Sequence, residues 1–327
     1  MSPRQAGPGP LLSVAGLTTV FEPPSGRLTA VDGVDLDVFR GQILAVVGES
    51  GCGKTMLSLS VLGLVPPPGR VVSGRAVFAG RDLLALSEGE RRAVRGARAS
   101  MIFQEPMTSL NPVLPIGEQV AEPVRVHRRA SKREALGAAA AMLAKVGLPD
   151  PARVLSRYPH ELSGGQRQRA MIAMALILSP QLLIADEPTT ALDVTVQRQI
   201  LDLVSGLSRD TGTAVVLVTH NLGVVAQVAN AVAVMYAGRL VEDAPVEAFF
   251  EGPAHPYGQG LLASLPRLAD RGRRLSAIPG MVPSLSRLPS GCHFHPRCPR
   301  AFGPCAGEVP PFFPLPDGRR VRCWLYA

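Results

Sequence analysis

The start of the chain carries short segments in which apolar and polar residues alternate. Alternation with a period of two is typical of strands that bury one face. We therefore predict a small antiparallel sheet ahead of the main core, with strands at 11–14, 17–21, 28–31 and 34–38 and a further strand at 73–78.

Three later segments are apolar with little interruption, which predicts strands that are buried on both faces of a parallel sheet. They are residues 43–47, 182–186 and 214–219. Segments with helical spacing separate them along the chain. This order of elements predicts an α/β core with an antiparallel β subdomain.

A helical region lies between these strands, at about residues 88–178. Within it, Ser131 and Glu134 have the spacing of a capping box, and Gly147 is placed to end the helix that begins there. The apolar face of this helix recurs at helical intervals through Leu136, Ala139, Leu143 and Val146.

Composition narrows the class of protein. The chain has 327 residues, 46% of them hydrophobic, which is enough for one large domain and a small one. Its formal charge is +8, but arginines scattered along the chain carry most of it. We therefore do not predict nucleic-acid binding, because a position near an anionic membrane surface explains the positive charge equally well.

No segment has the length of a membrane span. The longest apolar stretch, Ala170 to Leu178, is far below the roughly 20 residues that cross a bilayer. Residues 1–10 lack the apolar core of a signal peptide and are expected to form a disordered tail. We therefore expect a cytoplasmic protein, in which cysteines are more often metal ligands than disulfides.

The turn after the first buried strand has the composition of a phosphate-binding loop. Its glycines allow left-handed backbone conformations and bring N–H groups close to phosphate oxygens, while the helix that begins near Lys54 directs its positive end at them. Lys54 would reach the β- and γ-phosphates, and the Thr55 hydroxyl would hold Mg²⁺. A glycine-rich turn with a chance lysine is the alternative. The loop reads Gly48-Glu49-Ser50-Gly51-Cys52-Gly53-Lys54-Thr55, and Cys52 is expected to be only a small, tolerated side chain.

A second anion-binding device is predicted at residues 162–169. Ser163 would cap the helix that runs on toward Leu178, and Gly164 and Gly165 leave the helix N-terminus open to an anion. Taken alone, Ser-Gly-Gly is also a common turn.

Two later strands end in polar side chains. The strand that begins at Leu182 ends in two carboxylates, Asp186 and Glu187, and at the open edge of a parallel sheet such residues meet ligands. Asp186 is expected to hold Mg²⁺ through water, and Glu187 to face the γ-phosphate. The strand at 214–219 delivers His220. Ordinary strand-end charges and a structural histidine are the alternatives.

In this order, the motifs resemble the ATP-binding subunit of an ABC transporter over about residues 11–245. The resemblance implies a P-loop NTPase (ABC ATPase) fold with a helical signature subdomain, and hydrolysis of ATP with Mg²⁺. It assigns nucleotide binding to Gly48, Ser50, Gly51, Cys52, Gly53, Lys54, Thr55 and Gln104; Mg²⁺ to Thr55, Gln104 and Asp186; the signature to Ser163, Gly164, Gly165 and Gln166; the D-loop to Asp193; and catalysis to Glu187 and His220. Phe21 is the nearest candidate for the aromatic residue that stacks on adenine.

The same resemblance implies partners. The phosphate loop and the signature lie in separate parts of one chain, so two ATPase chains placed head to tail would complete each nucleotide site. The second ATPase is expected to be a paralogue. Two transmembrane permease subunits and an extracytoplasmic peptide-binding protein complete the expected complex, on the cytoplasmic face of the inner membrane. Residues Gln104 to about Pro123 are the candidate docking surface for the permease, with a plain surface loop as the alternative.

After about residue 245 the composition shifts to Pro, Arg and Gly, and this part resembles the C-terminal extension of oligopeptide and dipeptide importer ATPases, whose relatives also serve nickel uptake. Four cysteines there could wrap one tetrahedral site. By the resemblance they would hold a [4Fe-4S] cluster, with zinc or unliganded thiols as alternatives, and the cluster would be structural. The cysteines are Cys292, Cys298, Cys305 and Cys323; the nearby His293 and His295 are expected to be bystanders.

The sequence therefore predicts a tail at 1–10, an ABC ATP-binding domain at 11–245 and a Cys-containing C-terminal domain at 246–327. The function implied is an ATPase that powers import of oligopeptides or dipeptides. The alternatives are the same motor for nickel or another small solute, and a soluble ABC ATPase that acts on nucleic acid or ribosomes.

Overall fold

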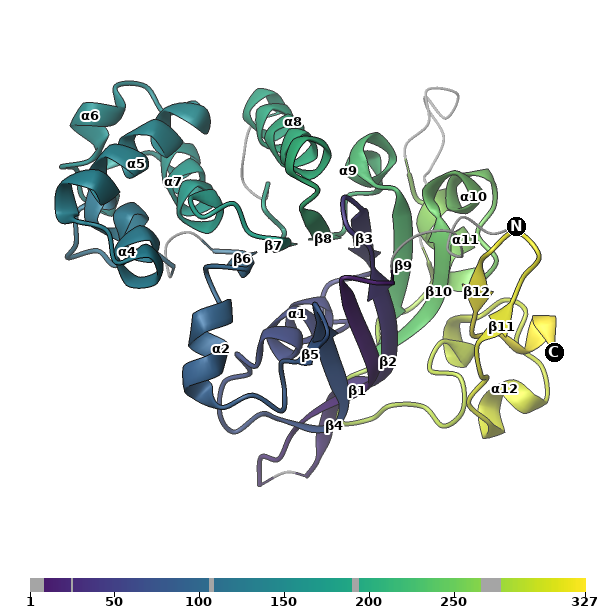
Figure 1. The fold of residues 1–327 in the computed structure, drawn as a ribbon. Helices are drawn as coiled ribbons and strands as arrows, with labels where there is room; N and C mark the ends of the chain where they lie inside the picture. Colours follow the sequence, from purple (N-terminus) through teal and green to yellow (C-terminus); the bar gives the residue numbers. More distant parts are fainter. Residues whose placement is uncertain (1–8, 25, 106–108, 190–193, 266–277) are drawn as a thin grey trace. The chain divides into compact units, whose positions relative to one another are not determined.

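The computed structural model describes residues 9–24, 26–105, 109–189, 194–265 and 278–327 (Figure 1). The chain divides into two compact units. The first contains residues 1–39, 43–85 and 218–327, and the second contains residues 40–42 and 86–217.

The first unit contains the predicted antiparallel sheet, in the order β2-β1-β4-β5. The sequence predicted four short strands at its start, but the structure has two long ones, because irregularities in the β1–β2 register lie within the strands instead of ending them. One falls between Val14 and Leu17, where Gly16 takes a φ of 60°. The strands are β1 (Leu12–Phe21), β2 (Leu28–Val38), β4 (Arg70–Phe78) and β5 (Arg81–Asp82).

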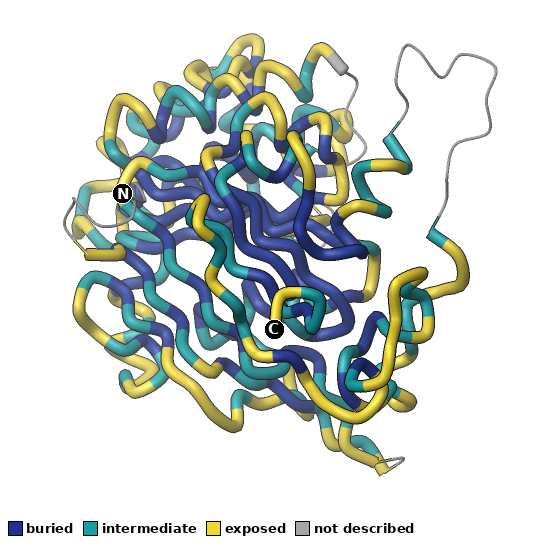
Figure 2. The backbone as a smooth tube through the Cα atoms, turned by 90° about the vertical axis from the view of Figure 1, so that its right-hand side faces the viewer, coloured by how far each residue is buried: buried dark blue, intermediate teal, exposed yellow. Residues whose placement is uncertain are grey.

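The buried strands of this unit surround the phosphate loop. Strand β3 (Ile43–Val47) is fully buried and runs parallel to β9 (Ala231–Tyr236), which pairs antiparallel with β10 (Arg239–Pro245). Helix α1 (Lys54–Leu62) follows the loop, and α9 (Leu222–Val228) precedes β9. Figure 2 shows long stretches of buried backbone along the strands, as their apolar sequences predict.

The C-terminal residues pack against β10. Strand β12 (Arg320–Val321) pairs with β10 on one side and with β11 (Phe313–Pro314) on the other. The Arg320 Nη2 donates to the buried Asp243 Oδ2 at 2.7 Å, and Val321 packs with Ala254 and Cys323. The other elements here are α10 (Val246–Glu251), α11 (Pro256–Ala263), η3 (His295–Arg297), α12 (Pro304–Gly307) and η4 (Trp324–Tyr326).

The second unit contains the predicted helical region, in which α4 (Ile116–Arg128), α5 (Lys132–Lys145), α6 (Pro151–Val154) and α7 (Gly164–Leu176) lie close together in Figure 1. The capping box of Ser131 and Glu134 is formed, and Gly147 has a φ of 75° just beyond the helix, so both local predictions are confirmed. Other helices of this unit are α2 (Glu88–Val94), η1 (Pro159–Glu161) and α8 (Val194–Thr211).

Two parallel strands lie in the same unit. Strand β6 (Ala99–Ile102) pairs in parallel with β7 (Leu182–Asp186), and every residue of both is buried. Strand β8 (Ala214–Thr219) leaves this unit and enters the first. Among the helices in the described ranges, none is long and apolar enough to cross a bilayer.

Glu242 holds the start of the C-terminal extension onto β10. This fully buried carboxylate accepts the N–H groups of Ala254 and His255, each at 2.8 Å. The Glu242→Ala variant would leave two buried backbone donors without their partner, so we expect it to lose about 2 kcal/mol of unfolding free energy. Urea denaturation measures the loss, and Glu247→Ala, which removes an exposed carboxylate of α10, is the control. Equal stability of the two variants would contradict this role.

Candidate functional site

The predicted phosphate loop joins β3 to α1, and its backbone forms hydrogen bonds with the side chain of Lys54. Lys54 is only 6% exposed, and its Nζ donates to the carbonyl oxygens of Gly48 and Glu49 at 2.8 and 3.0 Å. A nucleotide would replace these two carbonyls with phosphate oxygens as partners of the ammonium group. The strand, loop and helix predicted from the sequence are thus confirmed, and the contacts of Lys54 with ATP stay a prediction.

Two glycines of the loop are required by close packing. A side-chain carbon on Gly48 would collide with the Met235 carbonyl oxygen, and one on Gly53 would collide with the Ala30 carbonyl oxygen. Gly53 also has a φ of 107°, which side chains disfavour. Cys52 is fully buried, and burial raises the pKa of its thiol, which agrees with a small packing side chain.

The predicted signature begins a helix whose first turn is accessible. Ser163 is the N-cap of α7, and its hydroxyl accepts the N–H of Gln166 at 3.3 Å, while the Gln166 side chain accepts the Ser163 N–H at 3.0 Å. Ser163 and Gly164 are exposed. The cap was predicted; the reciprocal bond from Gln166 was not, although Ser-x-x-Gln is the spacing that indicates it.

The end of β7 brings two predicted residues together. Asp186 is 1% exposed at the last position of the strand, and Glu187 follows with a φ of 46°, outside the region that most residues prefer. The Gln104 Nε2 lies 3.4 Å from the Glu187 Oε2. Gln168 of α7 donates to the Pro188 carbonyl oxygen at 2.7 Å and so fixes the chain just after the carboxylates.

His220 lies just after β8 and is exposed. The Thr219 hydroxyl accepts the Asn221 N–H at 3.0 Å, and the Asn221 side chain caps α9, so the turn that carries His220 is held on its C-terminal side. Asp193, the predicted D-loop residue, lies outside the described residues. Lys54, Thr55 and His220 belong to the first unit; Gln104, Ser163, Asp186 and Glu187 belong to the second.

Phe21 is the last residue of β1. Its ring lies against Gly69, where a side-chain carbon would come within 2.6 Å of it. Phe21 therefore packs on the turn that follows α1, and stacking on adenine stays a prediction.

The segment predicted to dock a permease exposes large apolar side chains. Val113 is 74% exposed and Leu114 is 43% exposed, and Phe103, which directly precedes the segment, is 37% exposed. The segment nevertheless has a fixed anchor, because the buried Gln119 side chain bonds to the backbone of Asn111 and to the Leu114 carbonyl oxygen. Residues 106–108 lie outside the described part of the chain.

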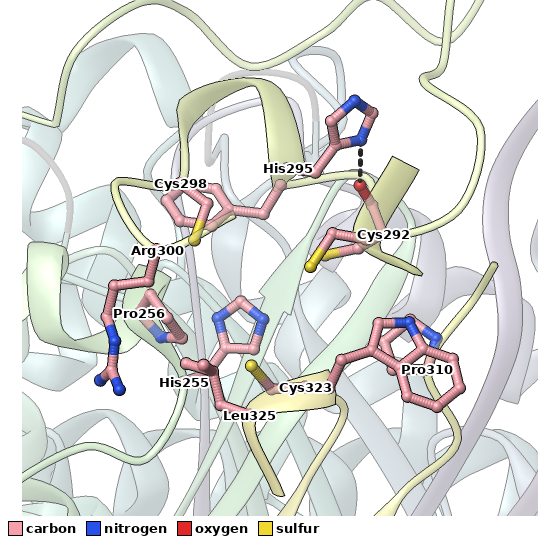
Figure 3. Close-up of a pocket in the computed structure, with 12 residues that line it drawn as sticks. His255, Pro256, Cys292, His295, Cys298, Arg300, Pro310, Cys323 and Leu325 are labelled. Carbon is pink, nitrogen blue, oxygen red and sulfur yellow. Dashed lines mark hydrogen bonds between the residues drawn. The ribbon is translucent and has the colours of Figure 1, made fainter. Parts of the chain in front are cut away.

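The four cysteines of the C-terminal extension line one small pocket (Figure 3). In the figure, the thiols of Cys292, Cys298 and Cys323 point toward a common space. Within the described residues, however, no three His, Cys, Asp or Glu side chains are close enough together to hold a metal ion as placed. The pocket lining is His255, Pro256, Cys292, Phe294, His295, Cys298, Arg300, Cys305, Pro310, Cys323, Trp324 and Leu325.

The chemistry of this pocket fits a thiolate-ligated group. Burial, and then the neighbouring cysteines, raise the pKa of Cys292 to about 11, and burial raises those of Cys298 and Cys323. A cation in the pocket would reverse these shifts by stabilising thiolates. His293 is not in the lining, since its Nδ1 lies 2.8 Å from the Ala237 carbonyl oxygen, whereas His295 is in it.

Sequence reasoning missed one group of residues that contacts the phosphate loop. Tyr257 accepts the Glu49 N–H at 2.8 Å, and Arg297 forms an ion pair with the Glu49 carboxylate. The His-Pro-Tyr sequence at 255–257 and the arginine before Cys298 are visible in the sequence, but nothing there links them to a loop 200 residues earlier.

Comparison with known proteins identifies the class. A family model described as ABC transporter matches residues 31–190, and a model described as oligopeptide/dipeptide transporter, C-terminal region, matches residues 241–305. The chain belongs to the ABC transporter family, and the prediction of an ABC-type ATPase is confirmed.

Relatives match along nearly the whole chain. A putative peptide import ATP-binding protein of Brucella melitensis is 52% identical, with 96% of each chain covered. The dipeptide transport ATP-binding protein DppD of Bacillus subtilis is 49% identical, with 96% of this chain and 94% of its own covered. The DppD of Escherichia coli is 47% identical, with 96% of each covered.

A solved structure confirms the fold class. The ATP-binding cassette MJ0796, in a dimeric post-hydrolysis state bound to ADP and Pi, matches with a TM-score of 0.66 and 27% identity. The match covers 72% of this chain and 98% of that one. The predicted ABC ATPase fold is therefore correct.

If Glu187 is the general base, Glu187→Gln should bind MgATP with nearly unchanged affinity but hydrolyse it about 10² to 10⁴ times more slowly, because an amide cannot take a proton from water. Single-turnover hydrolysis and nucleotide titration separate the two effects. Near-normal turnover would remove Glu187 from this role. The matched control is Glu161→Gln, an exposed glutamate in the same unit.

Proposed function

We propose that this ATPase powers the import of oligopeptides or dipeptides through a membrane permease. The observation that carries the proposal is the coverage of the match: relatives with peptide-import names align over 96% of this chain, including the C-terminal extension. That extension matches a region described for oligopeptide/dipeptide transporters, which supports peptides over other solutes.

In this proposal, hydrolysis of ATP depends on positioning of the attacking water and on neutralisation of the negative charge of the phosphates. Lys54 and the loop N–H groups would bind the β- and γ-phosphates. Thr55, Asp186 and Gln104 would hold Mg²⁺, which would supply neutralisation of the developing charge. Glu187 orients and deprotonates the attacking water, and its 3.4 Å contact with Gln104 supports a shared position at the reacting end of the nucleotide. His220 orients the γ-phosphate.

A second ATPase chain, a paralogue in this proposal, supplies the signature to each site. The exposure of Ser163 and Gly164 at an ordered helix N-terminus supports this, because such a terminus can accept the phosphate of a nucleotide bound to another chain. ATP held between the two chains closes the pair, and hydrolysis releases it. Asp193 belongs to the same interface in this proposal.

Two permease subunits and an extracytoplasmic peptide-binding protein complete the proposed complex. The exposed apolar side chains of Val113 and Leu114 support a docking surface in the segment from Gln104 to about Pro123. The chain would then sit at the cytoplasmic face of the membrane as a peripheral subunit. We divide it into an ATP-binding domain at 11–245 and a C-terminal domain at 246–327.

In the C-terminal domain, Cys292, Cys298, Cys305 and Cys323 would hold a [4Fe-4S] cluster, with zinc as the alternative. Their common pocket and their all-thiol donor set support either group. The bound group would supply a cross-link between segments that have few apolar contacts of their own.

The transport proposal is tested by reconstitution. The subunit is combined in liposomes with the permease and the second ATPase encoded beside it, and the binding protein is loaded with a mixture of di- to pentapeptides. We expect peptide-dependent stimulation of ATP hydrolysis and uptake of labelled peptide, both lost with Glu187→Gln. Stimulation by Ni²⁺ or another small solute, with none by peptides, would overturn the proposal.

The cluster proposal is tested by composition. Anaerobically purified protein should contain about four iron and four sulfide per chain, with a broad absorption near 400 nm, and Cys298→Ser should lose them. Stoichiometric zinc without iron would contradict the cluster. Cys52→Ser is the matched control, because this buried cysteine lies in the phosphate loop and is not in the pocket.

A further inference from the structure

One arginine of the cysteine segment is bonded to the phosphate loop. Arg297 Nη1 donates to Glu49 Oε2 at 2.8 Å and Arg297 Nη2 to Glu49 Oε1 at 3.1 Å, so the pair is bidentate. Glu49 is the second residue of the loop, and Arg297 directly precedes Cys298. The Arg297 side chain is 6% exposed, so solvent screens the pair poorly.

The other donors of Arg297 also have partners, which fixes the guanidinium in place. Its Nε donates to the Pro279 carbonyl oxygen at 2.8 Å, and its Nη2 lies within reach of the carbonyl oxygens of Ile278 and Gly280. The guanidinium carbon lies 5.7 Å from the centre of the Tyr236 ring. Its orientation is therefore set by the C-terminal extension and not by Glu49 alone.

A second contact holds the backbone of the same loop residue. The Tyr257 hydroxyl accepts the Glu49 N–H at 2.8 Å. The Tyr257 ring packs on Tyr236 and Phe294 with centroid distances of 4.6 and 5.3 Å, and Phe294 lines the cysteine pocket. Both the side chain and the backbone of Glu49 are thus tied to residues next to the cysteines.

A carboxylate in a loop that binds phosphate opposes its ligand, because like charges repel. The bidentate pair with Arg297 neutralises Glu49 and turns it toward the extension. We propose that Arg297 is a positioning residue for ATP binding: it neutralises and orients Glu49, and so makes nucleotide affinity depend on the state of the cysteine segment.

The dependence on the cysteine segment rests on the function proposed above, in which that segment holds a metal or cluster. Arg297 and Cys298 are adjacent, so a group that fixes the Cys298 thiolate also fixes the backbone that carries the guanidinium. Linkage is reciprocal: if the filled site favours nucleotide binding, bound nucleotide must slow loss of the metal by the same coupling.

The first experiment measures the dissociation constant of a fluorescent ATP analogue with Mg²⁺ for the full chain. Arg297→Ala should weaken binding about tenfold, equivalent to about 1.4 kcal/mol. Arg319→Ala is the matched control, since Arg319 pairs with Asp317 inside the extension and does not contact the loop, and it should bind like the native protein.

The double variant Glu49→Gln/Arg297→Ala separates charge neutralisation from general loosening. Removing the carboxylate removes the need for its partner, so affinity should return to within about threefold of the native protein. Loss of packing in the extension would not be rescued in this way. Arg297→Lys, which keeps the charge, should weaken binding less than Arg297→Ala and provides the comparison if the alanine variant does not fold.

Two outcomes overturn the proposal: native affinity in Arg297→Ala, or weakened affinity that Glu49→Gln does not rescue. Neither depends on what the cysteines bind, so the result is separate from that of the cluster test.

The second experiment tests linkage to the cysteine site. Stripping the metal with a chelator should weaken nucleotide binding in the native protein but not in Glu49→Gln/Arg297→Ala, and MgATP should slow the release of iron or zinc only in the native protein. Equal effects of stripping in both proteins would limit Arg297 to neutralising Glu49 and overturn the linkage.

Discussion

The close approach of the phosphate loop to neighbouring backbone is the constraint on which the first unit depends. Gly48 lies against Met235 at the end of β9, and Gly53 lies against Ala30 in β2, with no room for a side chain at either position. The Gly238 N–H also donates to the Cys52 carbonyl oxygen at 2.9 Å. The loop is thus packed against β2, β9 and the turn between β9 and β10, all distant from it in sequence, and this packing restricts the backbone of the loop.

The C-terminal extension adds to the same constraint. Glu242 of β10 fixes residues 254–255 of the extension by hydrogen bonds. Tyr257 follows two residues later, and its hydroxyl accepts a hydrogen bond from the loop. The hydrogen bonds to the Glu49 carboxylate raise the pKa of Arg297, so its guanidinium stays charged. The C-terminal extension carries none of the ATPase motifs, but it contacts the predicted phosphate loop. This contact gives a physical reason for the extension to be attached to an ATPase domain.

In the second unit, the predicted signature is shaped by contacts between neighbouring residues, whereas the phosphate loop of the first unit is held by residues distant in sequence. The N-terminus of α7 is shaped by a capping box within four residues, and the same device starts α2 and α5. Because Ser163 and Gln166 satisfy one another, Gly164 remains exposed on an ordered helix end. The N–H groups of such an ordered helix end carry a partial positive charge that favours anions.

The amino-acid sequence by itself determined the features that depend on neighbouring residues. The continuous apolar run at 43–47, capping at Ser131 and Ser163, and the spacing of Gly48 through Thr55 all act within a few residues, so the elements they predict are present. It also marked Gln104 and Glu187 as site residues, although only the fold shows that their side chains meet at 3.4 Å. The sequence misjudged β1 and β2, because bulges are compensated by the partner strand and leave no clear local signal.

Only the tertiary structure decided which distant residues support the loop. Arg297 lies 248 positions from Glu49, and nothing in the proline-rich sequence around this arginine indicates which carboxylate it contacts. The same holds for Tyr257 and for the common pocket of the four cysteines, whose spacing permitted one site without requiring it. Contacts of this kind depend on how strands and turns pack in three dimensions. Rules that consider only neighbouring residues in the sequence therefore cannot predict them.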